Sequence, residues 1–295
     1  MAAPAELDAM RRAIALSAAG LGATSPNPPV GCVIVGAGGT IAGEGYHQRK
    51  GEGHAETRAL AAAGERARGA TAVVTLEPCN HHGRTPACRQ ALLDAGVSRV
   101  VIALMEPTSR AQGGAAALRA AGVDVETGVL AGEARLVVGP WLAALALGRP
   151  VISWAYLLSG EGIAELPHDS PDAGFLRLNA DAVLHADGRV EEAVPGSHGA
   201  GILELGGRPP GMGAGQLAAR LHASGVRLLL LQGALDVAGP FLGAGLIDRV
   251  VAYLAPASSS VRPAAPRPWG LLPPGFGITE ISRVSGFVRV TGRRP

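Results

Sequence analysis

The sequence has few of the features that would place it in a membrane or outside the cell. It contains no run of about 18 apolar residues free of breakers, the length that a membrane-spanning helix needs. Its N-terminus lacks the basic, then apolar, then small-residue pattern of a secretory signal. We therefore expect a cytoplasmic protein without a membrane partner.

Cysteine and lysine are both scarce. The chain holds three cysteines, Cys32, Cys79 and Cys88, and a single lysine, Lys50. If two cysteines bind a metal, no pair remains for a structural disulfide. Cys32 lies within VGCVIV and is most simply a buried strand residue. We attribute the shortage of lysine beside many arginines to a GC-rich genome and not to function.

Charge and length limit the class of protein further. The formal net charge is only +2 and the basic residues are scattered, so we expect no nucleic-acid partner. A chain of 295 residues with 47% hydrophobic content can bury two modest cores. A prior of roughly 150 residues per domain then predicts two domains.

Two short segments carry zinc-ligand chemistry. The stretch TLEPCNHHGRTPAC contains Cys79 and Cys88, and GHAE contains His54 and Glu56. Zinc binds Cys thiolate and His nitrogen, and a catalytic site keeps three such ligands and leaves one position for water. We therefore predict that His54, Cys79 and Cys88 hold one Zn²⁺ per chain.

Local spacing predicts where these residues lie. Residues two apart on a helix point about 200° away from each other, so His54 and Glu56 can share a site only at a helix end. Thr85 is suited to be the N-cap of the next helix, Pro86 its first residue and Cys88 a first-turn residue. The positive end of the helix dipole would then favour the Cys88 thiolate.

These motifs resemble a known family. An H-x-E motif followed by P-C and a further Cys is typical of zinc deaminases. Here eight residues separate Cys79 from Cys88, and this longer form resembles the bifunctional deaminase/reductase of riboflavin biosynthesis. Matching segments in the N-terminal half are TSPNPPVGCVIV, GEGYH, GHAE, GATAVVTLEPCNHHGRTPAC, ALLDAGVSRVVIAL and GVLAGEAR.

The resemblance implies a role for each site residue. Glu56 would carry protons in the hydrolytic deamination of an aminopyrimidine, releasing ammonia. The substrate would be the ribosylaminopyrimidine phosphate formed when GTP cyclohydrolase opens the guanine ring. The implied substrate contacts are Asn27, His47, His81, Arg84 and Thr85.

Two alternatives concern this site. A closed structural zinc site could take His81 or His82 as a fourth ligand. Such a site gives no reason for Glu56 beside a ligand, so we favour a catalytic site. The family usually has Asp-Pro-Asn-Pro where this chain has Glu106-Pro107-Thr108-Ser109. This difference leaves open a deaminase of another diaminopyrimidine.

Hydrophobic periodicity and turn residues predict alternating helices and strands in the first half. Helices are expected at 6–19, 54–63, 86–95, 114–121 and 133–147, and strands at 30–35, 40–45, 70–76, 99–104 and 123–128. Such alternation predicts a layered α/β sheet covered on both faces. The resemblance likewise implies a cytidine-deaminase-like α/β/α sandwich, with the deaminase domain at 1–147.

The second domain, 148–295, is expected to be a shortened, dihydrofolate-reductase-like α/β domain. The family's reductase half opens with Lys-x-Ala-x-Ser-x-Asp-Gly, but here Ala155 and Glu161 stand at the Lys and Asp positions. Ala193 and Val194 replace a paired Asp-Asp, and Gln232-Gly233-Ala234 replaces Glu-Gly-Gly. We therefore do not expect NADPH to bind.

The interval before the strand at 227–231 supports this interpretation. About thirty residues separate Pro195 from that strand, whereas each βαβ unit needs thirty or more residues. We interpret the glycine-rich run GSHGAGILELGGRPPGMGAG as a flexible or truncated connection, since it lacks G-x-G-x-x-G. We thus predict a monofunctional deaminase that forms a homodimer and whose second domain is structural or regulatory.

Two other classes of function remain possible from the sequence. One is a working bifunctional enzyme that also reduces the ribose with NADPH, against which the replaced motif residues argue. The other is a non-catalytic zinc-stabilised scaffold, which the intact Glu56 disfavours.

Overall fold

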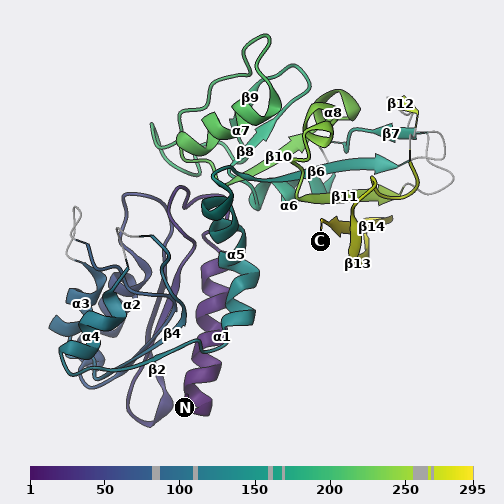
Figure 1. Ribbon diagram of the computed structural model, residues 1–295. Helices are drawn as coiled ribbons and strands as arrows, with labels where there is room; N and C mark the ends of the chain where they lie inside the picture. The colour runs from purple at the N-terminus through teal and green to yellow at the C-terminus, as the bar shows by residue number, and fades with distance from the viewer. Residues whose placement is uncertain are drawn as a thin grey trace. The chain divides into compact units, whose positions relative to one another are not determined.

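The chain forms two compact units. The computed structural model describes residues 1–81, 87–108, 112–158, 162–167, 170–254, 265–266 and 269–294. The units are Met1–Leu142 and Ala143–Pro295, so the boundary in the sequence falls within helix α5 (Ala131–Leu147) (Figure 1). The sequence instead predicts a boundary at the end of that helix.

The first unit is built on a five-stranded sheet with the order β2-β1-β3-β4-β5. Its strands are β1 (Gly31–Val35), β2 (Ile41–Tyr46), β3 (Thr71–Leu76), β4 (Arg99–Leu104) and β5 (Asp124–Thr127). Strand β1 is antiparallel to β2 and β3, whereas β3, β4 and β5 run parallel. The parallel strands therefore end at the same edge of the sheet.

Helices cover both faces of this sheet. They are α1 (Pro4–Ala18), α2 (Ala55–Ala63), α3 (Cys88–Asp94), α4 (Gly114–Ala120) and α5, with short 3₁₀ turns η1 (Ala37–Gly39) and η2 (Gly64–Ala67). A Cβ at Gly31 would lie 2.0 Å from a carbonyl of α1, and one at Gly43 would lie 2.4 Å from a carbonyl of α2. The absence of a side chain at these positions lets each helix approach the strands closely.

The two helical layers are distinct. An ion pair of 3.5 Å between Arg11 and Glu133 joins α1 to α5, whereas α2 contacts α3, which in turn contacts α4. Because both faces are covered, β1, β3 and β4 read as almost continuous apolar runs. Cys32 is fully buried in β1, as its position within VGCVIV predicts. The predicted α/β/α sandwich is confirmed.

The second unit contains a nine-stranded sheet whose main path is β13-β14-β11-β6-β10-β8-β9. The mutually parallel strands are β6 (Val151–Leu158), β8 (Ala182–Leu184), β10 (Leu228–Gln232) and β11 (Arg249–Leu254). Antiparallel additions are β7 (Gly162–Ala164), β9 (Val190–Glu192), β12 (Ala265–Pro266), β13 (Gly277–Val284) and β14 (Phe287–Arg293).

Side chains alternate between two apolar clusters along β6. Trp154 and Tyr156 belong to a cluster with α7 (Ala214–Ala223) and α8 (Leu235–Gly243). Ala155 and Leu157 belong to a second cluster with residues of α6 (Pro171–Leu178). This period of two shows that both faces of the sheet are buried, as in a mixed α/β domain.

One helix of this unit was not predicted. After the glycine-rich run, the interval between Pro195 and β10 contains helix α7, in which Leu217 and Leu221 are fully buried. The apolar face of α7 packs on the sheet and stabilises a helix that the preceding glycines conceal in the sequence. Within the described ranges, none of the helices combines the length and apolar character needed to cross a membrane.

Candidate metal and substrate site

Three donor atoms meet where two helices begin beside the end of β3. His54 is the N-cap of α2, Cys88 is the first residue of α3, and Cys79 follows β3. His54 Nδ1 lies 3.2 Å from Cys88 Sγ and 3.7 Å from Cys79 Sγ. The three donor atoms all lie within 4.8 Å of one another, and no other such group occurs in the described ranges.

Cys79 also caps the helix that carries Cys88. The Cys88 amide donates to Cys79 Sγ at 3.3 Å, and the Arg89 amide donates to the Cys79 carbonyl at 3.3 Å. The N-cap of α3 is Ala87, so the expectation that Thr85 fills this role is wrong. A sulfur from a distant loop takes the place of a hydroxyl cap and satisfies the first free amide of the helix.

The electrostatics of this group favour a cation. Hydrogen bonds from Cys88 and His54 lower the pKa of Cys79 to about 4, although burial opposes the shift. The neighbouring Cys79 sulfur, together with burial, raises the pKa of Cys88. A divalent cation would offset the repulsion between two negatively charged sulfurs. Tetrahedral zinc places its N and S ligands roughly 3.5–3.8 Å apart. The donor set and its spacing therefore fit zinc.

Glu56 lies next to the three donors without joining them. It is the second residue of α2, only 3% exposed, and it lines the same cavity. Burial raises the pKa of Glu56, His54 lowers it and Cys79 raises it further. The net shift is upward, which suits a carboxylate that accepts a proton and later releases it.

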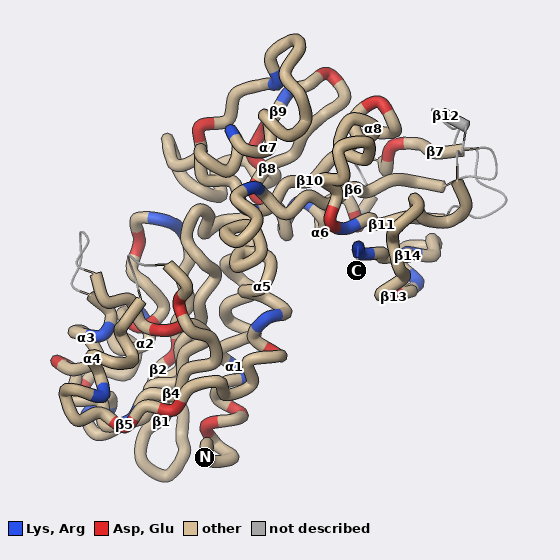
Figure 2. The backbone as a smooth tube through the Cα atoms, in the orientation of Figure 1, with Lys and Arg blue, Asp and Glu red and all other residues tan. Residues whose placement is uncertain are grey.

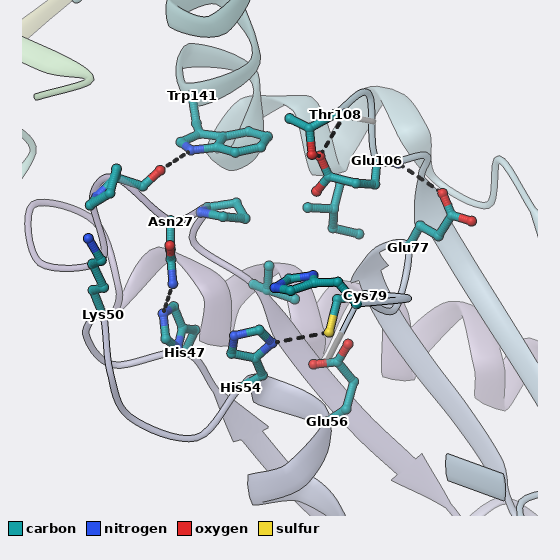
Figure 3. Close-up of a pocket in the computed structure, with 15 residues that line it drawn as sticks. Asn27, His47, Lys50, His54, Glu56, Glu77, Cys79, Glu106, Thr108 and Trp141 are labelled. Carbon is teal, nitrogen blue, oxygen red and sulfur yellow. Dashed lines mark hydrogen bonds between the residues drawn. The ribbon is translucent and has the colours of Figure 1, made fainter. Parts of the chain in front are cut away.

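These groups open into a cavity of about 290 Å³ (Figure 3). The lining residues are Pro26, Asn27, Pro28, Val30, His47, Lys50, His54, Glu56, Leu76, Glu77, Cys79, His81, Glu106, Thr108 and Trp141. The walls combine apolar side chains such as Val30, Leu76 and Trp141 with many polar and ionisable groups. A concave site in which polar groups converge beside apolar surface is typical of small-molecule binding.

His47 and Asn27 form a pair within the cavity. Burial and the nearby His54 lower the pKa of His47 to about 4, so the ring is neutral near pH 7. Its Nδ1 lies 3.3 Å from the Gly53 carbonyl, which requires a proton on Nδ1. Nε2 then accepts from Asn27 Nδ2 at 3.2 Å, and the Asn27 side-chain oxygen is left facing away from His47 (Figure 3).

The remaining predicted contacts differ in what can be said of them. His81 lines the cavity, and its buried Nδ1 has no hydrogen-bond partner in the described part of the chain. Arg84 and Thr85 lie outside the described residues.

Glu77 and Glu106 also line the cavity, although neither was among the predicted substrate contacts. Glu77 accepts from the Ala115 amide at the start of α4 at 2.9 Å and from the Glu106 amide at 3.2 Å. Glu106 accepts from the amide and hydroxyl of Thr108, at 3.0 and 2.7 Å. Glu77 thus fixes the start of the loop after β4, and Glu106 and Thr108, which belong to the segment that departs from Asp-Pro-Asn-Pro, line the cavity.

Trp141 and Lys50 were also missed. Trp141 lies on α5, is 6% exposed, and donates from Nε1 to the Pro26 carbonyl at 2.9 Å. Lys50 lies in the loop between β2 and α2 and is exposed. No local motif marks either residue, because a helix of the other layer and a loop bring them to the cavity.

Comparison with known proteins agrees with this geometry. The family model of the cytidine and deoxycytidylate deaminase zinc-binding region matches residues 5–104. A diaminohydroxyphosphoribosylamino-pyrimidine deaminase of Buchnera aphidicola is 50% identical over 127 residues, which is 43% of this chain and 86% of that protein. Fold and donor set together define a hydrolytic deaminase of the cytidine deaminase class.

The likeness extends through the second unit. The riboflavin biosynthesis protein RibD of Mycobacterium tuberculosis is 38% identical over 288 residues, covering 84% of each chain. A solved structure of Acinetobacter baumannii RibD superposes with a TM-score of 0.78 at 28% identity, covering 99% of both chains. The chain belongs to the RibD family, and its second unit has the family's reductase-like fold.

Coverage varies among these relatives. The Escherichia coli RibD protein is 44% identical over 192 residues, which is 61% of this chain but only 52% of that relative. The matched part of this chain thus spans about half the length of that protein.

Proposed function

We propose that the first unit deaminates the diaminopyrimidine ribosyl phosphate of riboflavin biosynthesis and that the second unit does not catalyse reduction. The observation that carries the first part is the position of Glu56. It is a buried carboxylate with a raised pKa, it stands beside three zinc-ligand atoms, and it lines a cavity of about 290 Å³.

His54, Cys79 and Cys88 would hold the zinc, since they form the three-donor group of the site. When bound, zinc supplies the acidity that makes water nucleophilic near neutral pH. The positive end of α3 and the Cys88 amide stabilise negative charge on the sulfurs.

Glu56 would move the protons of the reaction. Water adds to the ring carbon that bears the amine, and Glu56 takes the proton lost by that water. Glu56 gives it to the adjacent ring nitrogen, then takes the second proton from the new hydroxyl group and transfers it to the amine nitrogen as the carbon–nitrogen bond breaks. Ammonia leaves and a carbonyl remains. Burial, which raises the pKa of Glu56, favours its protonated form between these transfers.

Other cavity residues would orient the ring. Asn27 presents its side-chain oxygen to a substrate N–H, and neutral His47 holds that amide in place. The Nδ1 of His81, which has no partner in the ranges that the structure describes, offers a further hydrogen bond. Arg84 and Thr85 remain proposed substrate contacts from the family motif.

The second unit supports the proposed loss of reduction. Ala155 and Gln232, which stand at the family's Lys and Glu positions, line a cavity of about 10 Å³. That volume holds about one water molecule, whereas ligand pockets measure roughly 300–1,000 Å³. Arg177 lies across this edge of the sheet, donating to Gln232 at 2.9 Å and to the Ala193 carbonyl at 3.2 Å.

NADPH binding tests this part of the proposal. Calorimetric titration of the purified protein should give no saturable heat at micromolar NADPH, and the deaminated product should not cause NADPH oxidation. Micromolar binding with product-dependent oxidation would restore the bifunctional alternative, which the likeness to RibD over 84% of both chains favours.

We also propose that the protein is a homodimer. Strand β13 lies at the edge of its sheet, and its residues Ile278 and Ile281 are more than half exposed. Such an edge can pair with another strand. Light scattering coupled to size exclusion would report twice the chain mass, and the mass of a single chain would contradict the proposal.

Ammonia release tests the deaminase. The zinc-loaded protein should release ammonia from the diaminopyrimidine ribosyl phosphate, and its absorbance spectrum should change to that of the aminouracil. If ammonia appears only with another diaminopyrimidine, the chemistry stands and the substrate changes. Glu106, where the family has Asp, is the observation that favours this second candidate.

A further inference from the structure

The only lysine of the chain lies at the mouth of the deaminase cavity. Lys50 is one of the cavity's lining residues, and its side chain is exposed (Figure 3). In Figure 3 its amine lies on the same side as Asn27 and His47, across from Glu106 and Thr108. A compositional shortage explains why lysine is rare, but not why the single one stands here.

The neighbouring charges leave Lys50 available. Glu52 pairs with Arg49 at 3.3 Å and with Arg58 at 2.7 Å, so the acidic group of this loop already has two partners. Arg58 also donates to the Gly53 carbonyl at 3.3 Å. Across the residues that the structure describes, no ion pair involves Lys50.

Contacts at both ends hold the loop in place. A hydrogen bond of 3.3 Å between His47 Nδ1 and the Gly53 carbonyl joins the end of β2 to the start of α2. The Arg58 side chain of α2 fixes Glu52 from the other direction. Lys50 is therefore presented from an anchored turn and reaches the cavity by its flexible side chain alone.

The charges around the cavity differ from one side to the other. Of the described lining residues, Lys50 is the only one with a permanent positive charge, while Glu56, Glu77 and Glu106 are carboxyl groups. An anionic substituent of a bound ring would be attracted to the Lys50 side and away from Glu106.

We propose that Lys50 binds the phosphomonoester of the substrate and sets the preference for a phosphorylated ribosylaminopyrimidine. This inference rests on the proposed deaminase function and adds a specificity-determining residue to it. A lysine ammonium is a compact point charge that suits a mobile phosphate at a cavity mouth. The pyrimidine would then lie at Glu56 with its ribosyl phosphate directed toward solvent and Lys50.

Kinetics with paired substrates test the proposal. Lys50→Met should raise KM for the phosphorylated substrate about tenfold, the effect of losing one charge-assisted hydrogen bond. It should change KM for the dephosphorylated analogue less than about twofold and leave kcat similar, because the contact binds ground and transition states equally. Lys50→Arg should retain most of the preference.

Arg49→Met is the matched control. Arg49 is an exposed cation one residue away, but it pairs with Glu52 and does not line the cavity. It should leave both KM values unchanged. The assignment would be overturned if Lys50→Met raised KM equally for both substrates, or if it raised KM for neither.

A direct readout comes from the single lysine. Reductive methylation with ¹³C-formaldehyde labels Lys50 and the N-terminal amine, which gives two resolvable NMR signals. A ribose phosphomonoester should shift the Lys50 signal saturably, whereas ribose alone should not. No shift at tens of millimolar would refute the contact. Because this experiment needs no turnover, it separates failure of the Lys50 assignment from failure of the deaminase proposal, which absent ammonia would reveal.

Discussion

Each unit has its own sheet with helices on both faces, but the two units differ in the side chains at the strand ends. In the first, the residues after β3 and before α2 and α3 converge on a cavity of about 290 Å³. In the second, Ala155 and Gln232 border only about 10 Å³. The comparison teaches that the fold provides the positions for a site in both units, whereas the side chains at those positions determine how much space is open there.

The polar groups of the two units are also satisfied differently. Glu56 is buried with a raised pKa, and the buried Nδ1 of His81 has no hydrogen-bond partner among the described residues. Both are unfavourable arrangements that a substrate can relieve. In the second unit Arg177 is saturated by Gln232, Glu191 and the Ala193 carbonyl. The charged residues are distributed over both units (Figure 2), so it is arrangement and not charge content that separates them.

The largest expected effect is on turnover in the first unit. Glu56→Gln removes the proton carrier but no metal ligand, so kcat should fall about 10²- to 10⁴-fold while zinc content stays near one per chain. Ammonia release and metal analysis measure the two quantities. Glu65→Gln, an exposed carboxyl in η2, is the control and should change neither. An active Glu56→Gln protein would mean that another group carries the proton.

The next effect concerns metal retention. Cys79→Ser and Cys88→Ser should each reduce zinc well below one per chain after dialysis against a chelator, because each removes one of three protein ligands. Cys32→Ala, in the adjacent β1, should retain the metal, since Cys32 is buried but is not part of the three-donor group. Full zinc content in both serine variants would refute the assigned ligand set.

A third prediction asks whether the two units are energetically separate. Arg149 forms two bonds of 2.7 Å with Asp248, which also accepts from the Ile152 amide at 2.8 Å. Asp248→Ala leaves that amide without an acceptor and leaves Arg149 with only the Pro150 carbonyl, at 2.9 Å, so it should destabilise the second unit by about 3 kcal/mol. Urea unfolding followed by tryptophan fluorescence measures this loss, while metal analysis follows the first unit.

Asp248→Asn is the matched variant, because it keeps an acceptor for the Ile152 amide and should lose less. Zinc content and deaminase activity should persist through the transition that Asp248→Ala shifts. If zinc is lost in the same transition, the units unfold together and the second unit is required for the fold of the first.

The sequence predicted the parts of the site that are adjacent in the chain. His54 and Glu56 come from one helix start, and Cys79 and Cys88 stand at the two ends of one loop, so spacing alone brings the members of each pair near each other. The N-cap of α3 was predicted wrongly, since the cap is Cys79 Sγ from outside the helix. Residue preferences at helix ends do not predict a capping group that comes from a residue several positions outside the helix.

The missed residues share a different cause. Trp141 comes from α5, more than a hundred residues from Pro26, to which it donates. Lys50 lies in a polar loop whose sequence does not differ from that of an ordinary solvent-exposed turn. Helix α7 directly follows a glycine-rich stretch, and those glycines do not favour a helix prediction. In each case tertiary packing decides the outcome, and periodicity within a short window does not contain that information.

The smallest predicted effect lies in the first unit, away from the cavity. Burial would raise the pKa of Glu6, but hydrogen bonds from Arg99 and the Ala3 amide lower it below the ordinary value of 4.5. A carboxyl with a lowered folded-state pKa stabilises the protein above its unfolded pKa, and that contribution is lost as the pH falls through the folded value. Glu6→Gln should therefore cost about 1–2 kcal/mol at pH 7.

The difference between wild type and Glu6→Gln should shrink below about pH 4.5 as Glu6 becomes protonated. Urea unfolding of both proteins at pH 7 and at pH 4 measures it, and loss of zinc at low pH affects the two proteins alike. If the difference in unfolding free energy does not change with pH, the Glu6 side chain stabilises the fold by its packing and not by its charge. In that case Arg99 is satisfied by Asp124 and Glu126 alone, with which it also pairs.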